Sequence, residues 1–157
     1  MINIVLARVD DRLIHGQVVN EWISAVNPTH IMIADDDLVN DKFMSDIYRA
    51  LIPIWLEAKI LSVEDTAACL SDMEGKNGRI FILARTPEAF ERLAKCGIPI
   101  KEVSFADKMY FQNKIAVPKA YQESMRQLIA RNIELYAIQH PGDPKEEIVL
   151  GSKSKKE

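Results

Sequence analysis

Short apolar runs alternate with helical patterns along most of this chain, and this alternation restricts the fold more than any other feature. Five runs are typical of strands buried in a sheet, and they lie at residues 2–7, 31–34, 58–61, 80–84 and 103–105. Strands that are joined through helices form parallel sheets with helices packed on both faces. The alternation therefore predicts an α/β fold with an open, mainly parallel β-sheet.

The segments between these strands carry the usual start and stop signals of helices. Helices are expected over residues 16–26, 41–51, 63–73, 87–96 and 118–132. Ser62 is placed to cap the third of them, Pro87 occupies the first helical position of the fourth, and Gly97 is placed to end it. The alternation breaks at residues 106–110, and a short strand or hairpin is expected over 111–117 and a last strand over 133–138. The late irregular segment suggests one or two added antiparallel strands.

The chain is expected to form a single domain over residues 1–150, followed by a polar, disordered tail at 151–157. A formal net charge of −3 argues against binding of nucleic acid. The sequence has no signal peptide pattern and no apolar run long enough to span a bilayer, which favours a cytoplasmic protein. Cys69 and Cys96 fit no metal-binding spacing and are expected to be reduced and buried.

The ionisable side chains are densest where the first strand meets the first helix. Arg8, Asp10, Asp11, Arg12 and His15 fall within eight residues of one another. Ligands of open α/β sheets bind at the carboxyl ends of the strands. This turn is therefore the predicted functional site.

A histidine at this place could act as a general base, a metal ligand or a nucleophile. No serine or cysteine stands in the turn to be activated, and no second histidine lies at a metal-binding spacing. Instead, Arg8 and Arg12 supply guanidinium groups, and the helix that begins at Gly16 or Gln17 supplies backbone N–H groups. Both kinds of group bind the oxygens of a phosphoryl group. The pattern favours a phosphoryl group carried by His15 itself, although a solvated network of ion pairs would use the same residues. Either Asp10 or Asp11 could orient the site, and their spacing does not decide between them.

The sequence Arg-Val-Asp-Asp-Arg-Leu-Ile-His-Gly-Gln-Val at residues 8–18 closely resembles the active-site signature of the IIB subunits of the mannose/fructose/sorbose family of bacterial sugar phosphotransferase systems. The similarity extends over essentially the whole chain. Residues 34–41 resemble the acidic loop of the family, and residues 85–87 resemble its threonine and proline before a helix. Residues 141–148 are similar to the tails of hexosamine-type members.

The resemblance implies a phosphotransferase that works as a phosphocarrier. Its signature histidine, which matches His15, would take a phosphoryl group on the δ nitrogen from a phosphohistidine of a IIA protein and pass it to a sugar entering through the membrane components IIC and IID. Arg12, and after it Arg8, would contact the phosphoryl group. No cofactor or metal is implied. The protein would lie at the membrane through IIC and IID, and since family members often pair, a homodimer is a further expectation.

One segment departs from the family pattern. Many members carry a glycine pair after the fifth strand, where this chain has Ala106 and Asp107. Glycine lets backbone N–H groups approach an anion, and alanine and aspartate restrict that approach. The alternative function is therefore a catalytically weakened regulatory or binding module on the same fold. An enzyme that binds a small phosphate compound and is unrelated to transport is a further, less favoured reading.

Several other residues invite a functional interpretation, and for each the structural one is favoured. Residues 35–37 form an acidic cluster that is expected to be a solvated loop ahead of a helix. Trp22, Trp55 and the apolar run 52–56 are expected to be packing residues, although the run could be a docking patch. His30 and His140 are expected to be structural.

Overall fold

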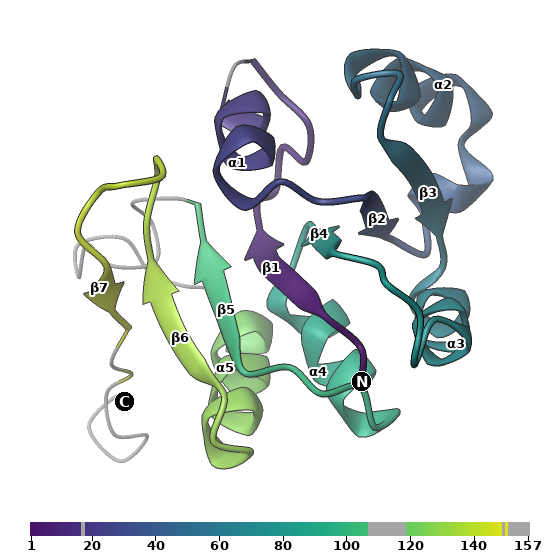
Figure 1. The fold of residues 1–157 in the computed structure, drawn as a ribbon. Coiled ribbons are helices and arrows are strands. Elements are labelled where there is room, and N and C mark those ends of the chain that lie inside the picture. Colours follow the sequence, from purple (N-terminus) through teal and green to yellow (C-terminus); the bar gives the residue numbers. More distant parts are fainter. Residues whose placement is uncertain (17, 107–118, 149, 151–157) are drawn as a thin grey trace.

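The chain folds around one seven-stranded sheet with the strand order β3-β2-β4-β1-β5-β6-β7 (Figure 1). The computed structural model describes residues 1–16, 18–106, 119–148 and 150. The strands are β1 (Ile4–Val9), β2 (His30–Ala34), β3 (Glu57–Leu61), β4 (Ile80–Ala84), β5 (Glu102–Phe105), β6 (Glu134–Ala137) and β7 (Glu146–Glu147). Strands β1 to β6 pair in parallel, and β7 pairs antiparallel with β6. The predicted α/β fold with a mainly parallel sheet is confirmed.

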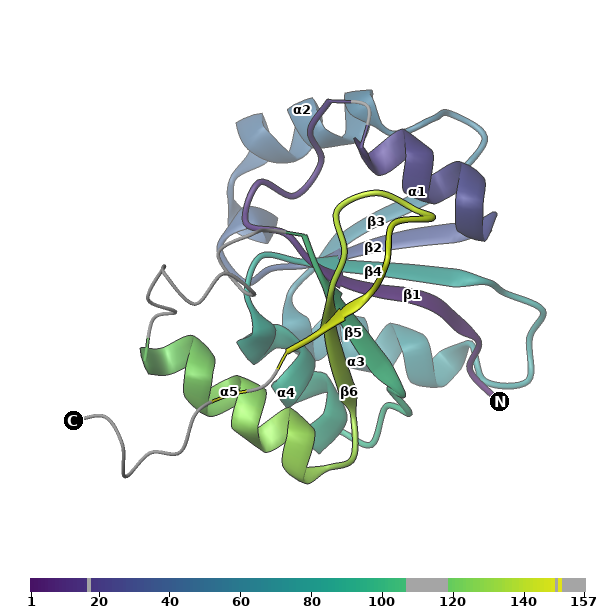
Figure 2. The same ribbon diagram turned by 90° about the vertical axis from the view of Figure 1, so that its left-hand side faces the viewer.

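Helices cover both faces of the sheet, as the alternation predicts (Figure 2). They are α1 (Val18–Val26), α2 (Lys42–Leu51), α3 (Val63–Asp72), α4 (Pro87–Lys95) and α5 (Lys119–Ala130), with a short 3₁₀ helix, η1 (Leu38–Asn40). Side chains of α1 and α2 pack on one face, and those of α3, α4 and α5 pack on the other. The sheet therefore has two cores, and the β1–α1 loop belongs to the face that carries α1 and α2.

The predicted helix signals act as their chemistry requires. The hydroxyl of Ser62 accepts a hydrogen bond from the N–H of Asp65 at 3.0 Å at the start of α3. Pro87 begins α4, and Gly97 follows that helix with a φ of +89°, a left-handed conformation that glycine adopts without a steric cost.

Two boundaries differ from the sequence-based expectation. Strand β1 continues through Arg8 to Val9, because both residues pair with β4 on one side and β5 on the other. The antiparallel strand is β7, in a segment for which no strand was expected. The strand expected over residues 111–117 and the tail at 151–157 lie outside the described residues.

The two cysteines are free thiols, but the expectation that both are buried is wrong. Cys96 is exposed because it follows the last turn of α4, and Cys69 is only partly buried. Among the described residues, no helix is long and apolar enough to cross a membrane.

Candidate active site at the end of β1

The loop after β1 is shaped by two buried aliphatic side chains. Leu13 and Ile14 both insert into the core beneath α1 and α2. Leu13 has a φ of +55°, which is unusual for a residue with a branched side chain, and its N–H donates to the carbonyl of Asp10 at 2.9 Å. Gly16, also left-handed with a φ of +51°, redirects the chain into α1. As a result, His15 is held at the edge of the sheet, with 22 % of its side chain exposed.

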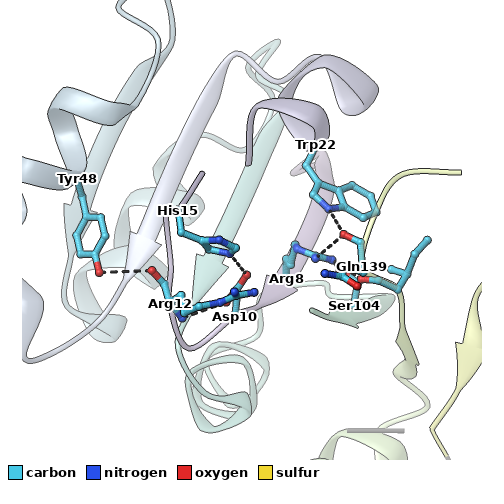
Figure 3. A network of polar contacts seen from close by, with 9 residues as sticks. Arg8, Asp10, Arg12, His15, Trp22, Tyr48, Ser104 and Gln139 are labelled. Carbon is cyan, nitrogen blue, oxygen red and sulfur yellow. Dashed lines mark hydrogen bonds and ion pairs between the residues drawn. The ribbon is translucent and has the colours of Figure 1, made fainter. Parts of the chain in front are cut away.

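The carboxylate of Asp10 fixes the imidazole of His15. Oδ2 of Asp10 lies 2.7 Å from Nε2 of His15 (Figure 3). Asp10 is buried, whereas Asp11 is exposed. Because an ionised carboxylate only accepts hydrogen bonds, this contact places the ring proton on Nε2 and leaves the lone pair of Nδ1 available. Of the two candidate carboxylates, the structure brings Asp10 to the histidine.

Arg12 presents its guanidinium group beside the same carboxylate. Oδ1 of Asp10 accepts a hydrogen bond from the backbone N–H of Arg12 at 3.0 Å and lies 3.5 Å from its Nε. The Arg12 side chain is 54 % exposed, so its remaining N–H groups face solvent. A guanidinium group in this position can bind two oxygens of a phosphoryl group at once.

Arg8 has a different environment from Arg12, because its side chain is only 2 % exposed. Nη1 donates to the carbonyl of Ile138 at 2.9 Å, and Nη2 donates to that of Gln139 at 3.1 Å. The guanidinium group also lies over the ring of Trp22, 4.6 Å from its centroid. Burial lowers the pKa of Arg8 to about 10, which still leaves it charged at neutral pH. Arg8 therefore ties β1 to the segment that follows β6.

Trp22 is buried as expected, and its Nε1–H also donates to the carbonyl of Gln139 at 3.1 Å. The same segment is attached to α1 a second time, because Nδ1 of His140 lies 2.8 Å from Oε1 of Glu21. His30 also has a polar partner close by, because its Nδ1 lies 2.7 Å from the hydroxyl of Thr29. These contacts give His30 and His140 structural roles.

The acidic cluster after β2 also has structural partners. Oδ1 of Asp36 accepts from the N–H of Val63 at 2.9 Å and so caps α3, and Oδ2 accepts from Nη1 of Arg92 at 2.6 Å. The hydrogen bond from Arg92 lowers the pKa of Asp36 more than any other contact. Asp35 binds the N–H groups of Asp37 and Leu38 in its own loop. These bonds hold the loop against α3 and α4.

Two residues of this edge were not predicted to belong to the site. Tyr48 of α2 donates its hydroxyl to the carbonyl of Arg12 at 3.4 Å (Figure 3). Arg85 follows β4 directly, next to the carbonyl of Ala84 that accepts from the N–H of Asp10, and its Nε lies 3.0 Å from Oδ2 of Asp35. The sequence could have revealed Arg85, because a residue directly after a central strand lies at the edge of the sheet where ligands bind.

The charge of Asp11 acts on a more distant part of the site. Burial raises the pKa of Tyr121 on α5, the negative charge of Asp11 raises it further, and the positive charge of Arg85 opposes both.

The remaining predicted site residues are only partly described. Gly16 is exposed at the start of the helix, and Gln17 lies outside the described residues. Ala106 is buried and its N–H donates to the carbonyl of Val9 at 3.0 Å, so it continues β5 at the first of the two positions where many family members carry glycine. Asp107 lies outside the described residues.

Comparison with known proteins agrees with this architecture. The sequence is 28 % identical over 156 residues to the fructose-specific EIIB component of Bacillus subtilis, covering 95 % of both chains. It is 29 % identical over 157 residues to the N-acetylgalactosamine-specific IIB component 1 of Escherichia coli, covering 93 % of this chain and 96 % of that one. The crystal structure of an N-acetylgalactosamine-specific IIB component 1 from Escherichia coli superposes with a TM-score of 0.84 at 25 % identity, over 94 % of this chain and 100 % of that one.

A family model described as the sorbose-subfamily IIB component of the phosphotransferase system matches residues 4–153. This match includes every strand, the β1–α1 loop and His15. The chain therefore belongs to the sorbose-subfamily IIB components of the sugar phosphotransferase system.

Proposed function

We propose that this protein is a phosphocarrier that accepts a phosphoryl group from a phosphohistidine of a IIA protein on Nδ1 of His15. It then passes the group to a sugar that enters through the membrane components IIC and IID. The work takes place at the cytoplasmic face of the membrane. Members of the family are phosphotransferases, and the residues that follow give that activity a mechanism in this chain.

The observation that carries the proposal is the contact of 2.7 Å between Asp10 and Nε2 of His15. It leaves the lone pair of Nδ1 as the nucleophile. In the first transfer this lone pair forms a new N–P bond while the N–P bond of the donor phosphohistidine breaks, and the donor imidazole recovers its electron pair. The His15 ring gains positive charge as the bond forms, and the buried carboxylate stabilises that charge.

Arg12 stabilises the phosphoryl group during transfer. Phosphoryl transfer passes through a loose transition state whose charge is spread over the equatorial oxygens, so catalysis consists mainly of positioning and charge neutralisation. The exposed fork of Arg12 can bind two of these oxygens, and Asp10 keeps its backbone beside His15. Arg8, whose donors are occupied by two carbonyl groups, is a positioning residue for β1 and the segment after β6.

In the second transfer a hydroxyl oxygen of the sugar forms the new P–O bond, and the N–P bond to His15 breaks. The hydroxyl proton leaves to a base supplied with the sugar by the membrane components. His15 returns to its neutral form with the proton still on Nε2, ready for the next cycle.

The test is incubation with a phosphorylated IIA protein carrying ³²P. The expected product is a label that is stable to base, labile to acid and absent in His15→Ala, whereas the matched variant His140→Ala is labelled like the unchanged protein. A chain that folds but is never labelled would support the alternative, a regulatory or binding module on the same fold.

A further inference from the structure

The outer face of α2 carries an apolar stripe that the described residues leave uncovered. Phe43, Ile47 and Leu51 follow one another at intervals of four residues, so they share one face of the helix over about 12 Å. Phe43 is 73 % exposed, and Leu51 is 51 % exposed. Val39, before the helix, and Ile54 and Trp55, after it, are also exposed. These six residues are called the α2 patch below.

Packing of this chain alone does not account for the α2 patch. The run 52–56 was expected to be buried, and Ile52 and Leu56 are indeed in the core, but Ile54 is fully exposed and Trp55 is 64 % exposed. The inward side of α2 makes its packing contacts through other residues, Met44 and Tyr48. Exposed apolar side chains gathered on one face of a helix mark a place of interaction.

The middle of α2 lies next to the loop that carries His15, whereas Ile54 and Trp55 lie at the opposite edge of the sheet, just before β3 begins. Tyr48, which follows Ile47 in the sequence, donates its hydroxyl to the carbonyl of Arg12 at 3.4 Å. Figure 2 shows α2 alongside the β1–α1 loop, and Figure 3 shows Tyr48 facing that loop on the side of Arg12. A molecule that covers His15 and Arg12 from solvent therefore borders α2.

The chemistry beside the patch favours a protein partner over a lipid surface. Lys42 and Asp46 lie directly beside Phe43 and Ile47 and form an ion pair of 2.7 Å. Insertion into a bilayer would remove both charges from water at a large cost. An apolar centre with aromatic side chains and a charged rim is instead typical of an interface between water-soluble proteins that associate and separate.

We propose that the α2 patch is the docking surface for the phosphorylated IIA protein, with Phe43 as its anchor. The inference rests on the proposed function. A protein donor must bring its phosphorus atom to bonding distance of Nδ1 of His15, so its surface has to cover the neighbourhood of the loop. Arg12, at the border between the α2 patch and His15, carries the positive charge that matches the phosphoryl group of the donor.

The test compares a protein donor, which needs docking, with phosphoramidate, a small phosphoryl donor that does not. In Phe43→Ala and Ile47→Ala, KM for the phosphorylated IIA protein should rise about tenfold or more, which corresponds to about 1.4 kcal/mol. The value of kcat and the rate of labelling of His15 by phosphoramidate should stay within about twofold. The matched control is Ile129→Ala, an exposed apolar residue of α5 on the opposite side of the sheet, and it should leave KM unchanged.

An unchanged KM in both patch variants would overturn the docking surface and leave the phosphocarrier intact. A patch variant that keeps its KM for the donor but loses transfer to sugar in vesicles containing IIC and IID would also overturn it, since the patch would then serve the membrane components. Sedimentation that changes from dimer to monomer in these variants, with KM unchanged, would assign the patch to a second copy of the chain. Failure of the unchanged protein to be labelled by either donor would refute the proposed function itself.

Discussion

The exchange of Asp10 for asparagine tests the arrangement around His15 most directly. The carboxylate accepts from Nε2–H of His15 with one oxygen and from the backbone N–H of Arg12 with the other, at 2.7 and 3.0 Å. Asparagine has nearly the same shape but only one accepting oxygen. Its NH₂ group must therefore face either the imidazole or the N–H of Arg12, and one of the two bonds is lost.

The size of the effect follows from the charge on the carboxylate. A hydrogen bond to a charged group contributes about 1.5–3 kcal/mol. Losing about 2 kcal/mol of stabilisation of the positive imidazole in the transition state slows transfer about 30-fold. If the NH₂ group faces His15, the ring proton moves to Nδ1 and blocks the nucleophile, and the loss is larger.

The assay is single-turnover transfer from a saturating phosphorylated IIA protein, followed by rapid quenching, with ¹⁵N NMR of the His15 ring to identify the protonated nitrogen. Asp37→Asn removes an equal charge from an exposed position in the loop after β2, and it is the matched control. Transfer by Asp10→Asn at the unchanged rate, with the proton still on Nε2, would refute the reasoning.

Four further variants or titrations probe other contacts. Arg12→Lys loses the two-pronged donor, so single-turnover transfer should slow about tenfold with an unchanged urea midpoint; equal rates would contradict its role. Arg8→Met leaves two carbonyl groups without their donor, so the free energy of unfolding in urea should fall by about 2–4 kcal/mol, and no fall would contradict the contacts. Because Arg92 lowers the pKa of Asp36, the carboxylate stabilises the fold above about pH 4 and stabilises it less as the pH falls. Asp36→Asn should therefore lower the free energy of unfolding by about 0.5–1 kcal/mol at pH 7, a small value because the pair is exposed, and by little near pH 2. Tyr136 of β6 is buried and donates its hydroxyl to Glu102 at 2.9 Å. Burial raises the pKa of this hydroxyl, so its contribution to stability is complete below about pH 10 and is lost as the pH rises further; absorbance at alkaline pH should show its ionisation only with unfolding.

The sequence predicts the framework well because that framework depends on local patterns. Strand β4 has the expected bounds, and the caps at Ser62 and Gly97 act through residues close to them in the chain. The burial of Arg8 could not be predicted from local patterns. A charged residue after an apolar run suggests that the strand has ended, but the carbonyl of Ile138 that satisfies this charge lies 130 residues further along the chain.

The site was predictable in its residues but not in their division of roles. Asp10 and Asp11 are equivalent on the basis of spacing, and only the path of the loop decides which one is buried against His15. The exposure of Ile54 and Trp55 could not be predicted for a related reason. Ile54 and Trp55 belong to an apolar run whose two ends are buried, and no periodicity distinguishes the middle of that run from its ends.

The left-handed backbone of Leu13 has a consequence for the proposed phosphocarrier cycle. Such a conformation costs of the order of 1 kcal/mol, and the buried side chain compensates for it. Core packing therefore fixes the curvature of the loop before any phosphorus arrives, and the loop need not reshape itself when the group leaves. In the proposed phosphocarrier, both transfers would then use the same loop geometry.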